Sequence, residues 1–90
     1  MSIAQIRYFV AVAEEGHVGR AARRLHVSQP PLTRQIRSLE QELGVQLFER
    51  TPRGMRLLSS GETLLVRARR ILAEVEGAID AVRRRGQGGA

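Results

Sequence analysis

The sequence predicts a mainly α-helical fold, in which a three-helix core is followed by a small two-stranded wing and a long C-terminal helix. Apolar residues recur at spacings of three and four through residues 2–15, 28–43 and 59–85, which is the period of amphipathic helices. A Thr-Pro-Arg-Gly sequence at 51–54 separates two short apolar runs that can pair as strands. Only three residues are aromatic, so the core must consist mainly of Leu, Ile, Val and Ala, which is typical of small helical proteins.

The first expected helix covers residues 2–15 and ends at Gly16, a favourable C-terminal stop. One of its sides is apolar through Ile3, Ile6, Phe9, Val10 and Ala13. Tyr8 and Val12 lie on another side, so this helix needs two neighbours. We expect the second side to dock against the long C-terminal helix, and simple exposure of Tyr8 is the alternative.

A short second helix is expected between His17 and His26. Its alanines and Leu25 face inward and permit close approach of another helix, while three arginines face outward. The chain then turns at Val27 into the next helix, which gives a helix-turn-helix at about residues 18–37. His17 is a poor N-cap compared with Ser or Thr, and His26 stands where many such turns place glycine.

Residues 28–43 predict a helix with two different faces. The apolar face, which requires a core, carries Leu32, Ile36, Leu39 and Leu43. The opposite face has short polar groups and guanidiniums, at Pro30, Thr33, Arg34 and Arg37. Ser28 is a favourable N-cap, two prolines occupy the first turn, and Gly44 gives the stop. A rigid, polar first turn tethered to an Ala-rich helix is what a reader of DNA base edges requires.

Residues 44–58 predict a two-stranded wing. Thr51 to Gly54 has Pro at the second position and Gly at the fourth, the preference of a type I turn. Arg50, Arg53 and Arg56 cluster at this hairpin. A basic hairpin beside a recognition helix is well placed to enter a minor groove or to bind phosphates, and a solvated loop without contacts is the alternative.

From Ser59 the chain is expected to stay helical to about Arg84, beginning with a capping box between Ser59 and Glu62. Its a and d heptad positions are apolar: Leu65, Ala68, Leu72, Val75, Ile79 and Val82. Because so long a stripe cannot be buried against so small a core, we expect homodimerisation through this helix. The alternative for its N-terminal half is docking onto the first helix. The predicted organisation is a DNA-binding domain at 1–58, a linker and dimerisation helix at 59–85 and a flexible tail at 86–90.

Composition limits the function classes. The chain has 90 residues, enough for one small domain, and its net charge of +6 favours a polyanionic partner such as nucleic acid. It has no cysteine and its apolar runs are too short to span a bilayer, which predicts a cytoplasmic protein without a membrane partner. His17 and His26 lack a neighbouring nucleophile or carboxylate cluster, so we expect neither an enzyme nor a metal or cofactor site. A non-specific basic coiled-coil interaction module is the competing interpretation.

Three stretches of sequence resemble the DNA-binding domain of LysR-type transcriptional regulators: YFVAVAEEG at 8–16, AARRLHVSQPPLTRQIRSLEQELGVQLFER at 21–50, and RG-x-RLL-x-x-G at 53–61. The resemblance implies a winged helix-turn-helix that binds an interrupted palindrome in promoter DNA as a homodimer, through antiparallel linker helices. It also implies that the chain is the DNA-binding fragment of a longer regulator. The co-inducer would then bind an effector domain absent here, and RNA polymerase is a possible partner of the full-length protein.

The resemblance also implies which residues meet double-stranded DNA. Gln29, Pro30, Thr33 and Arg34 match the start of the recognition helix and become the expected base contacts. Ser28 and Arg37, with Arg50 and Arg53 of the wing, become the expected phosphate or minor-groove contacts. A guanidinium can fork onto guanine and a carboxamide can pair with adenine, while Pro30 and Thr33 can contact a thymine methyl group.

Overall fold

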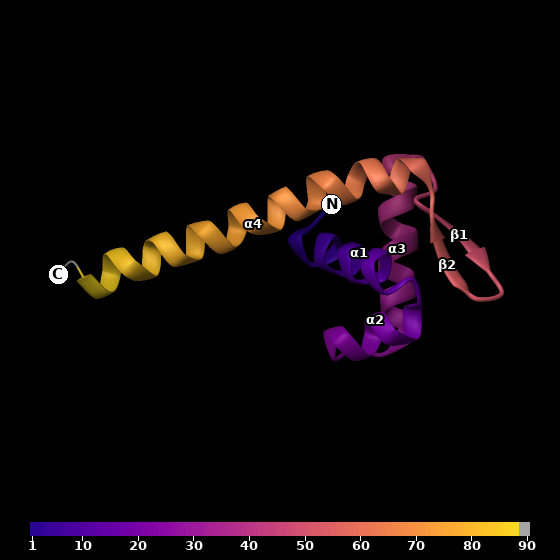
Figure 1. The fold of residues 1–90 in the computed structure, drawn as a ribbon, viewed down its shortest axis with the longest axis horizontal. Helices are drawn as coiled ribbons and strands as arrows, with labels where there is room; N and C mark the ends of the chain where they lie inside the picture. Colours follow the sequence, from indigo (N-terminus) through magenta and orange to yellow (C-terminus); the bar gives the residue numbers. More distant parts are fainter. Residues whose placement is uncertain (89–90) are drawn as a thin grey trace.

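The computed structural model describes residues 1–88 as three short helices, a two-stranded hairpin and a long final helix (Figure 1). In chain order the elements are α1 (Ile3–Glu15), α2 (Val18–Leu25), α3 (Gln29–Leu43), β1 (Phe48–Thr51), β2 (Gly54–Leu57) and α4 (Ser59–Gly88). The predicted mainly α-helical fold with a wing and a long last helix is confirmed. The first three helices gather beside the hairpin, and α4 continues well beyond them, which makes the molecule 55 Å long and 25 by 18 Å across.

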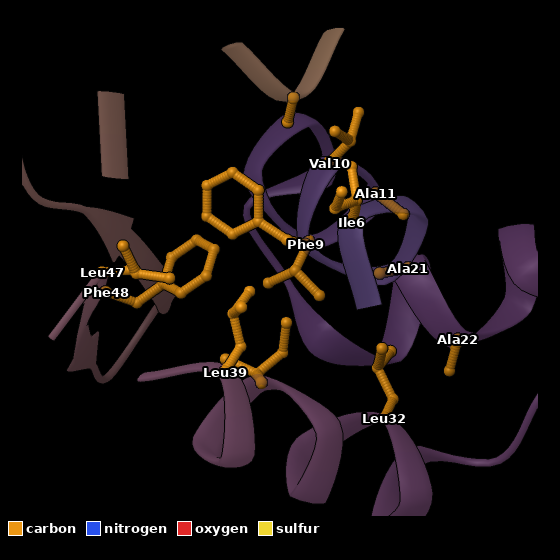
Figure 2. Close-up of a cluster of buried hydrophobic side chains, with 13 residues drawn as sticks. Ile6, Phe9, Val10, Ala11, Ala21, Ala22, Leu32, Leu39, Leu47 and Phe48 are labelled. Carbon is orange, nitrogen blue, oxygen red and sulfur yellow. The ribbon is translucent and has the colours of Figure 1, made fainter. Parts of the chain in front are cut away.

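The core lies between α1, α3 and the base of the hairpin (Figure 2). Its largest fully buried side chains are Phe9, Val12, Leu32, Leu39 and Leu47. The rings of Phe9 and Phe48 pack with their centroids 5.4 Å apart and their planes tilted by 50°. Ile3 and Leu43, predicted on the inward faces of their helices, are instead 40% and 39% exposed because they stand at helix ends beyond the core.

Both ends of α1 are capped. The Ser2 hydroxyl accepts a hydrogen bond from the Gln5 N–H, and the Gln5 carboxamide accepts one from the Ser2 N–H, each at 3.1 Å. This is a capping box, which satisfies backbone donors at the helix start. At the other end Gly16 takes the left-handed conformation, with φ of 67°, and donates to the Val12 carbonyl, as predicted for a glycine stop.

The predicted docking of α1 onto the long helix is confirmed, since α1 packs along the first half of α4 (Figure 1). Val12 on the second apolar side of α1 is fully buried and Tyr8 is half-buried. Ala68 of α4 is fully buried in the same core. In the single chain this side chain packs inside the domain, and the dimer contact in which it was predicted stays a prediction.

Helix α4 differs from its prediction at both ends. Ser59 is the first helical residue rather than the cap, since the Glu62 N–H donates to the Leu58 carbonyl at 2.9 Å, so the predicted capping box is absent. The helix continues to Gly88, so residues 86–88 of the predicted tail are helical and 89–90 lie outside the described residues. Within residues 1–88, no helix combines the length and apolar character needed to cross a membrane.

The wing, the hairpin of β1 and β2, is an antiparallel pair. Its register pairs Phe48 with Leu57 at the base and Thr51 with Gly54 at the tip, which leaves Pro52 and Arg53 as the turn. The predicted two-stranded wing is confirmed. Only one residue, Leu58, separates β2 from α4, so the wing and the long helix form a continuous unit.

Candidate nucleic-acid interface

A cleft of about 280 Å³ opens between the starts of α2 and α3 and the wing. It brings together Gln29 and Thr33 of α3 with Arg50 and Arg53 of the wing. An adjoining hollow of about 170 Å³ adds Arg37, which shares it with Thr33 and Arg50. Residues predicted from two separate segments therefore line one concave surface, which we call the cleft.

The start of α3 has the predicted form but not the predicted cap. Ser28 is the N-cap residue, yet its side chain makes no capping hydrogen bond. The reason is in the next residues: an N-cap side chain accepts from the second or third helical N–H, and Pro30 and Pro31 have none. The exposed Ser28 hydroxyl thus remains available to an external partner, as do the exposed side chains of Gln29, Pro30 and Arg34.

His17, predicted to be a poor cap, is in fact the N-cap of α2. Its Nδ1 accepts from the N–H groups of Gly19 at 3.0 Å and of Arg20 at 3.3 Å. This arrangement needs a lone pair on Nδ1, so the neutral ring carries its proton on Nε2. A side chain at position 19 would lie 2.9 Å from His17 Cε1 and 3.3 Å from Gln29 Nε2, so glycine there lets both side chains pack closely.

The turn between α2 and α3 depends on a residue in an uncommon conformation. His26 has φ of 58°, in the left-handed region, where the sequence pattern favours glycine. Its N–H and that of Val27 donate to carbonyls of the last turn of α2. The turn predicted at Val27 between the two helices is therefore formed, at the cost of strain at His26.

The arginines divide into paired and unpaired groups. Among residues 1–88 no ion pair involves Arg34, Arg37, Arg50 or Arg53, which are all exposed. Arg37, Arg50 and Arg53 line the cleft, whereas Arg34 is not among its lining residues. Arg56, predicted to join the basic cluster of the wing, is paired with Glu49 directly across the hairpin and so contributes less free positive charge.

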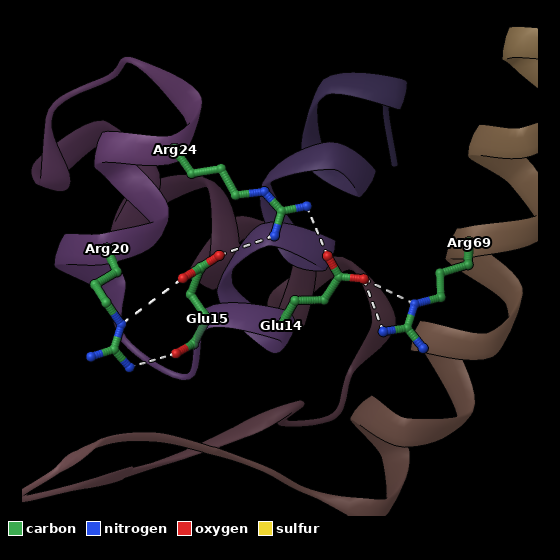
Figure 3. A network of polar contacts seen from close by, with 5 residues as sticks. All are labelled: Glu14, Glu15, Arg20, Arg24 and Arg69. Atoms are coloured by element: carbon green, nitrogen blue, oxygen red, sulfur yellow. Dashed lines mark hydrogen bonds and ion pairs between the residues drawn. The ribbon is translucent and has the colours of Figure 1, made fainter.

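Away from the cleft, arginines bind the end of α1 (Figure 3). Glu14 accepts from Arg24 of α2 at 2.7 Å and from Arg69 of α4 at 2.9 Å, while Glu15 is paired with Arg20 and Arg24. The hydrogen bond from Arg24, followed by that from Arg69, holds the pKa of Glu14 below its usual value. These two carboxylates are thus paired with arginines outside the cleft. The cleft itself is lined by Arg37, Arg50 and Arg53 with Glu40 beside them, so positive charge predominates there.

The predicted dimer residues divide along α4. Leu65 and Leu72 are half-buried against the core, and Ala68 is fully buried in it. Val75 is half-buried further along, while Ile79 and Val82 are 36% and 73% exposed beyond the end of α1. Nothing in residues 1–88 covers the last two, so this apolar face remains available to another chain.

Residues 3–62 match the model of the bacterial regulatory helix-turn-helix proteins of the lysR family. The HTH-type transcriptional regulator ClcR of Pseudomonas putida is 63% identical over 76 residues, which are 84% of this chain and 26% of ClcR. The crystal structure of the CbnR_DBD–DNA complex matches with a TM-score of 0.90 and 49% identity, over 96% of this chain and 99% of that one. The BenM_DBD/catB site 1 DNA complex matches with a TM-score of 0.95 and 39% identity, over the whole of both chains. This chain spans less than a third of ClcR and of full-length CbnR.

Proposed function

This chain belongs to the lysR family of bacterial regulatory helix-turn-helix proteins, and we propose that it binds double-stranded DNA sequence-specifically as a homodimer. The observation that carries the proposal is the cleft, where unpaired guanidiniums of α3 and of the wing line one concave surface beside an exposed helix start. The relatives of similar fold that are solved in complex with DNA support the same assignment.

In this proposal α3 enters the major groove. Gln29 and Arg34 read base edges, because a carboxamide pairs with adenine and a guanidinium with guanine, each worth about 1–3 kcal/mol of discrimination. Pro30 and Thr33 contact thymine methyl groups. Thr33 is half-buried in the lining of the cleft, while Pro30 is exposed in the first turn of α3.

The remaining contacts position the protein on the duplex. The Ser28 hydroxyl, which has no capping role here, donates to a phosphate, and Arg37 binds a phosphate from the same helix. Arg50 and Arg53 approach the flanking minor groove or its phosphates from the wing. These contacts release condensed counterions, so they make binding depend steeply on salt.

The exposed C-terminal half of α4 is the proposed dimer contact. Ile79 and Val82, extended by the half-buried Val75, Leu72 and Leu65, continue one apolar stripe at heptad spacing. Two such helices packed antiparallel would bury this stripe and place two recognition helices on one duplex. An interrupted palindrome with half-sites about one helical turn apart, or a multiple of it, follows from that symmetry.

The parent protein is proposed to be a cytoplasmic transcriptional regulator rather than an enzyme. Its co-inducer would be bound outside this chain, which accounts for under a third of the related regulators' length, and RNA polymerase is a further possible partner of the whole protein. No cofactor is proposed for this domain.

Selection of duplexes from a random pool tests the proposal. We expect an enriched, interrupted palindrome that binds at least about 10³-fold more tightly than a scrambled duplex at physiological salt. Arg34→Ala should weaken binding and relax the preference at one base pair. A monomer that binds all duplexes equally would contradict the proposal and would favour a non-specific basic interaction module instead.

A further inference from the structure

The root of the wing is hydrogen-bonded to α3 by one side chain. Glu40 Oε2 accepts from the N–H of Leu47 at 2.7 Å and from the N–H of Phe48 at 3.3 Å. Leu47 directly precedes β1 and Phe48 is its first residue, and both of their side chains are buried, at 1% and 4% exposure. The carboxylate therefore acts as an acceptor for backbone groups that no strand partner satisfies.

The exit of the wing is joined to the same point. The Leu58 N–H donates to the Leu47 carbonyl at 2.9 Å, and the Ser60 hydroxyl donates to the Gln46 carbonyl. Residues 46–48 are thus bonded to α3 through Glu40, to the junction of β2 and α4 through Leu58, and to α4 through Ser60. A shift of this segment would move the wing relative to α3.

From this geometry we propose that Glu40 is a positioning residue, which fixes the distance between the base-reading helix and the DNA-binding arginines of the wing. The proposal rests on the proposed function, because it assigns a role in DNA binding to a residue that does not touch DNA. Glu40 lies one turn beyond Arg37 on α3, and it lines the hollow of about 170 Å³ with Arg37 and Arg50. The Glu40 carboxylate therefore links α3 to the wing, which are the two parts of the proposed DNA interface.

Simple electrostatics makes the opposite prediction, which allows a decisive test. A carboxylate beside the cleft repels phosphate, so as a mere charge its removal would strengthen binding. As a positioning residue, Glu40 acts because its side chain is long enough to meet the N–H groups of Leu47 and Phe48. Glu40→Gln keeps an acceptor oxygen at the same distance and loses the charge. Glu40→Asp keeps the charge but is one methylene too short. The two variants separate charge from geometry.

The experiment measures duplex affinity and its salt dependence for the wild-type chain, Glu40→Gln and Glu40→Asp. We expect Glu40→Gln to bind within about threefold of wild type, because a neutral acceptor retains much of the hydrogen bonding. Glu40→Asp should bind about tenfold more weakly, and the slope of log K against log salt should fall by about one to two units as the wing arginines lose their phosphates. Glu42→Asp and Glu42→Gln are matched controls, since Glu42 is also on α3 but its partner is the N-terminal amine.

A second readout distinguishes positioning from a general loss of stability. In the Glu40→Asp background, adding Arg53→Ala should weaken binding by less than it does in wild type, because the misplaced wing no longer uses Arg53. Equal losses in both backgrounds, or tighter binding by Glu40→Gln with unchanged binding by Glu40→Asp, would overturn the proposal.

If the wild-type chain itself fails to bind DNA selectively, it is the proposed function that fails. Exchange of the Leu47 and Phe48 amide protons, measured without DNA, then still tests the contact: faster exchange in Glu40→Asp is expected, and unchanged exchange would refute it.

Discussion

Substitution of Gly54 by alanine should detach the tip of the wing from the body of the domain. Gly54 has φ of 141°, which L side chains rarely adopt, and an added Cβ would lie 2.3 Å from the Gly16 carbonyl oxygen. Because that oxygen is backbone rather than a flexible side chain, the hairpin must move away. The neighbouring Met55 N–H, which donates to the same oxygen at 3.2 Å, would lose its partner.

The strain at position 54 and the lost Met55 hydrogen bond together determine how much stability Gly54→Ala loses. Strain at such a backbone position costs about 1–3 kcal/mol, and the lost hydrogen bond adds about 1 kcal/mol, so the free energy of unfolding should fall by about 2–4 kcal/mol. Urea denaturation measures this change. Gly44→Ala is the matched control, since Gly44 also has positive φ, 73°, but nothing lies within 4 Å of its added Cβ. Gly44→Ala should lower the free energy of unfolding only by the cost of the left-handed conformation, about 1–2 kcal/mol.

Gly54→Ala should also change DNA binding, which binding assays at several salt concentrations measure. Arg53 precedes Gly54 in the turn, so displacement of the tip should remove its contact with DNA and lower the salt slope by about one unit. Gly44→Ala should leave the slope unchanged. Equal stability loss in the two variants, together with an unchanged slope for Gly54→Ala, would refute the argument that the Gly16 carbonyl fixes the wing.

Three further predictions concern other parts of the chain. His17→Ala should lower the free energy of unfolding by about 0.5–2 kcal/mol, as for other N-cap losses, and His17→Asn should retain most of it; equal urea midpoints for both variants would contradict the cap. Because Arg24 and Arg69 lower the pKa of Glu14 from its usual 4.5, the ion pairs of Glu14 should contribute fully to the free energy of unfolding above that pH. This contribution should be lost as pH falls through the lower pKa of the folded state. The free energies of unfolding of wild type and Glu14→Gln, measured by urea denaturation, should therefore differ by under about 1 kcal/mol above that pH and converge in acid, and a constant difference would count against the network. Val82→Arg should weaken dimerisation by placing charges in the apolar stripe, and sedimentation equilibrium that shows an unchanged dimer would exclude that face.

The faces and limits of the elements were largely predictable, because helical periodicity and turn residues are local signals. Leu32, Ile36 and Leu39 are buried as their spacing predicts, and Gly16 and Gly44 end their helices. Predictions of caps were less successful. Ser28 has the right residue type but faces two prolines without N–H groups, and Ser59 lies inside α4 because Leu58 is already bonded to the root of the wing.

The tertiary contacts of the site were not predictable from the same signals. The role of Glu40 depends on backbone donors seven and eight residues later, after a turn whose path no periodicity defines. Gly19 is significant only because His17 and Gln29 converge on it in space. For Ala68 the heptad pattern was correct, but the pattern alone does not say whether an apolar face meets another chain or α1. The contact residues proposed for DNA and for the dimer remain predictions.

The C-terminal half of α4 extends beyond the rest of the domain, so a small change in its direction moves its end a long way. Thirty residues of helix extend about 45 Å and α1 packs along the first half, so a bend of about 10° where α4 leaves α1 would displace the far end by about 4 Å. That displacement is close to the rise of one base pair, about 3.4 Å. In the proposed antiparallel dimer, the direction in which each α4 leaves its domain would therefore affect how many base pairs separate the half-sites. At the other end of α4, the buried Gly61 lets the first turn lie against the root of the wing, since a Cβ there would lie 2.4 Å from the Leu47 carbonyl oxygen.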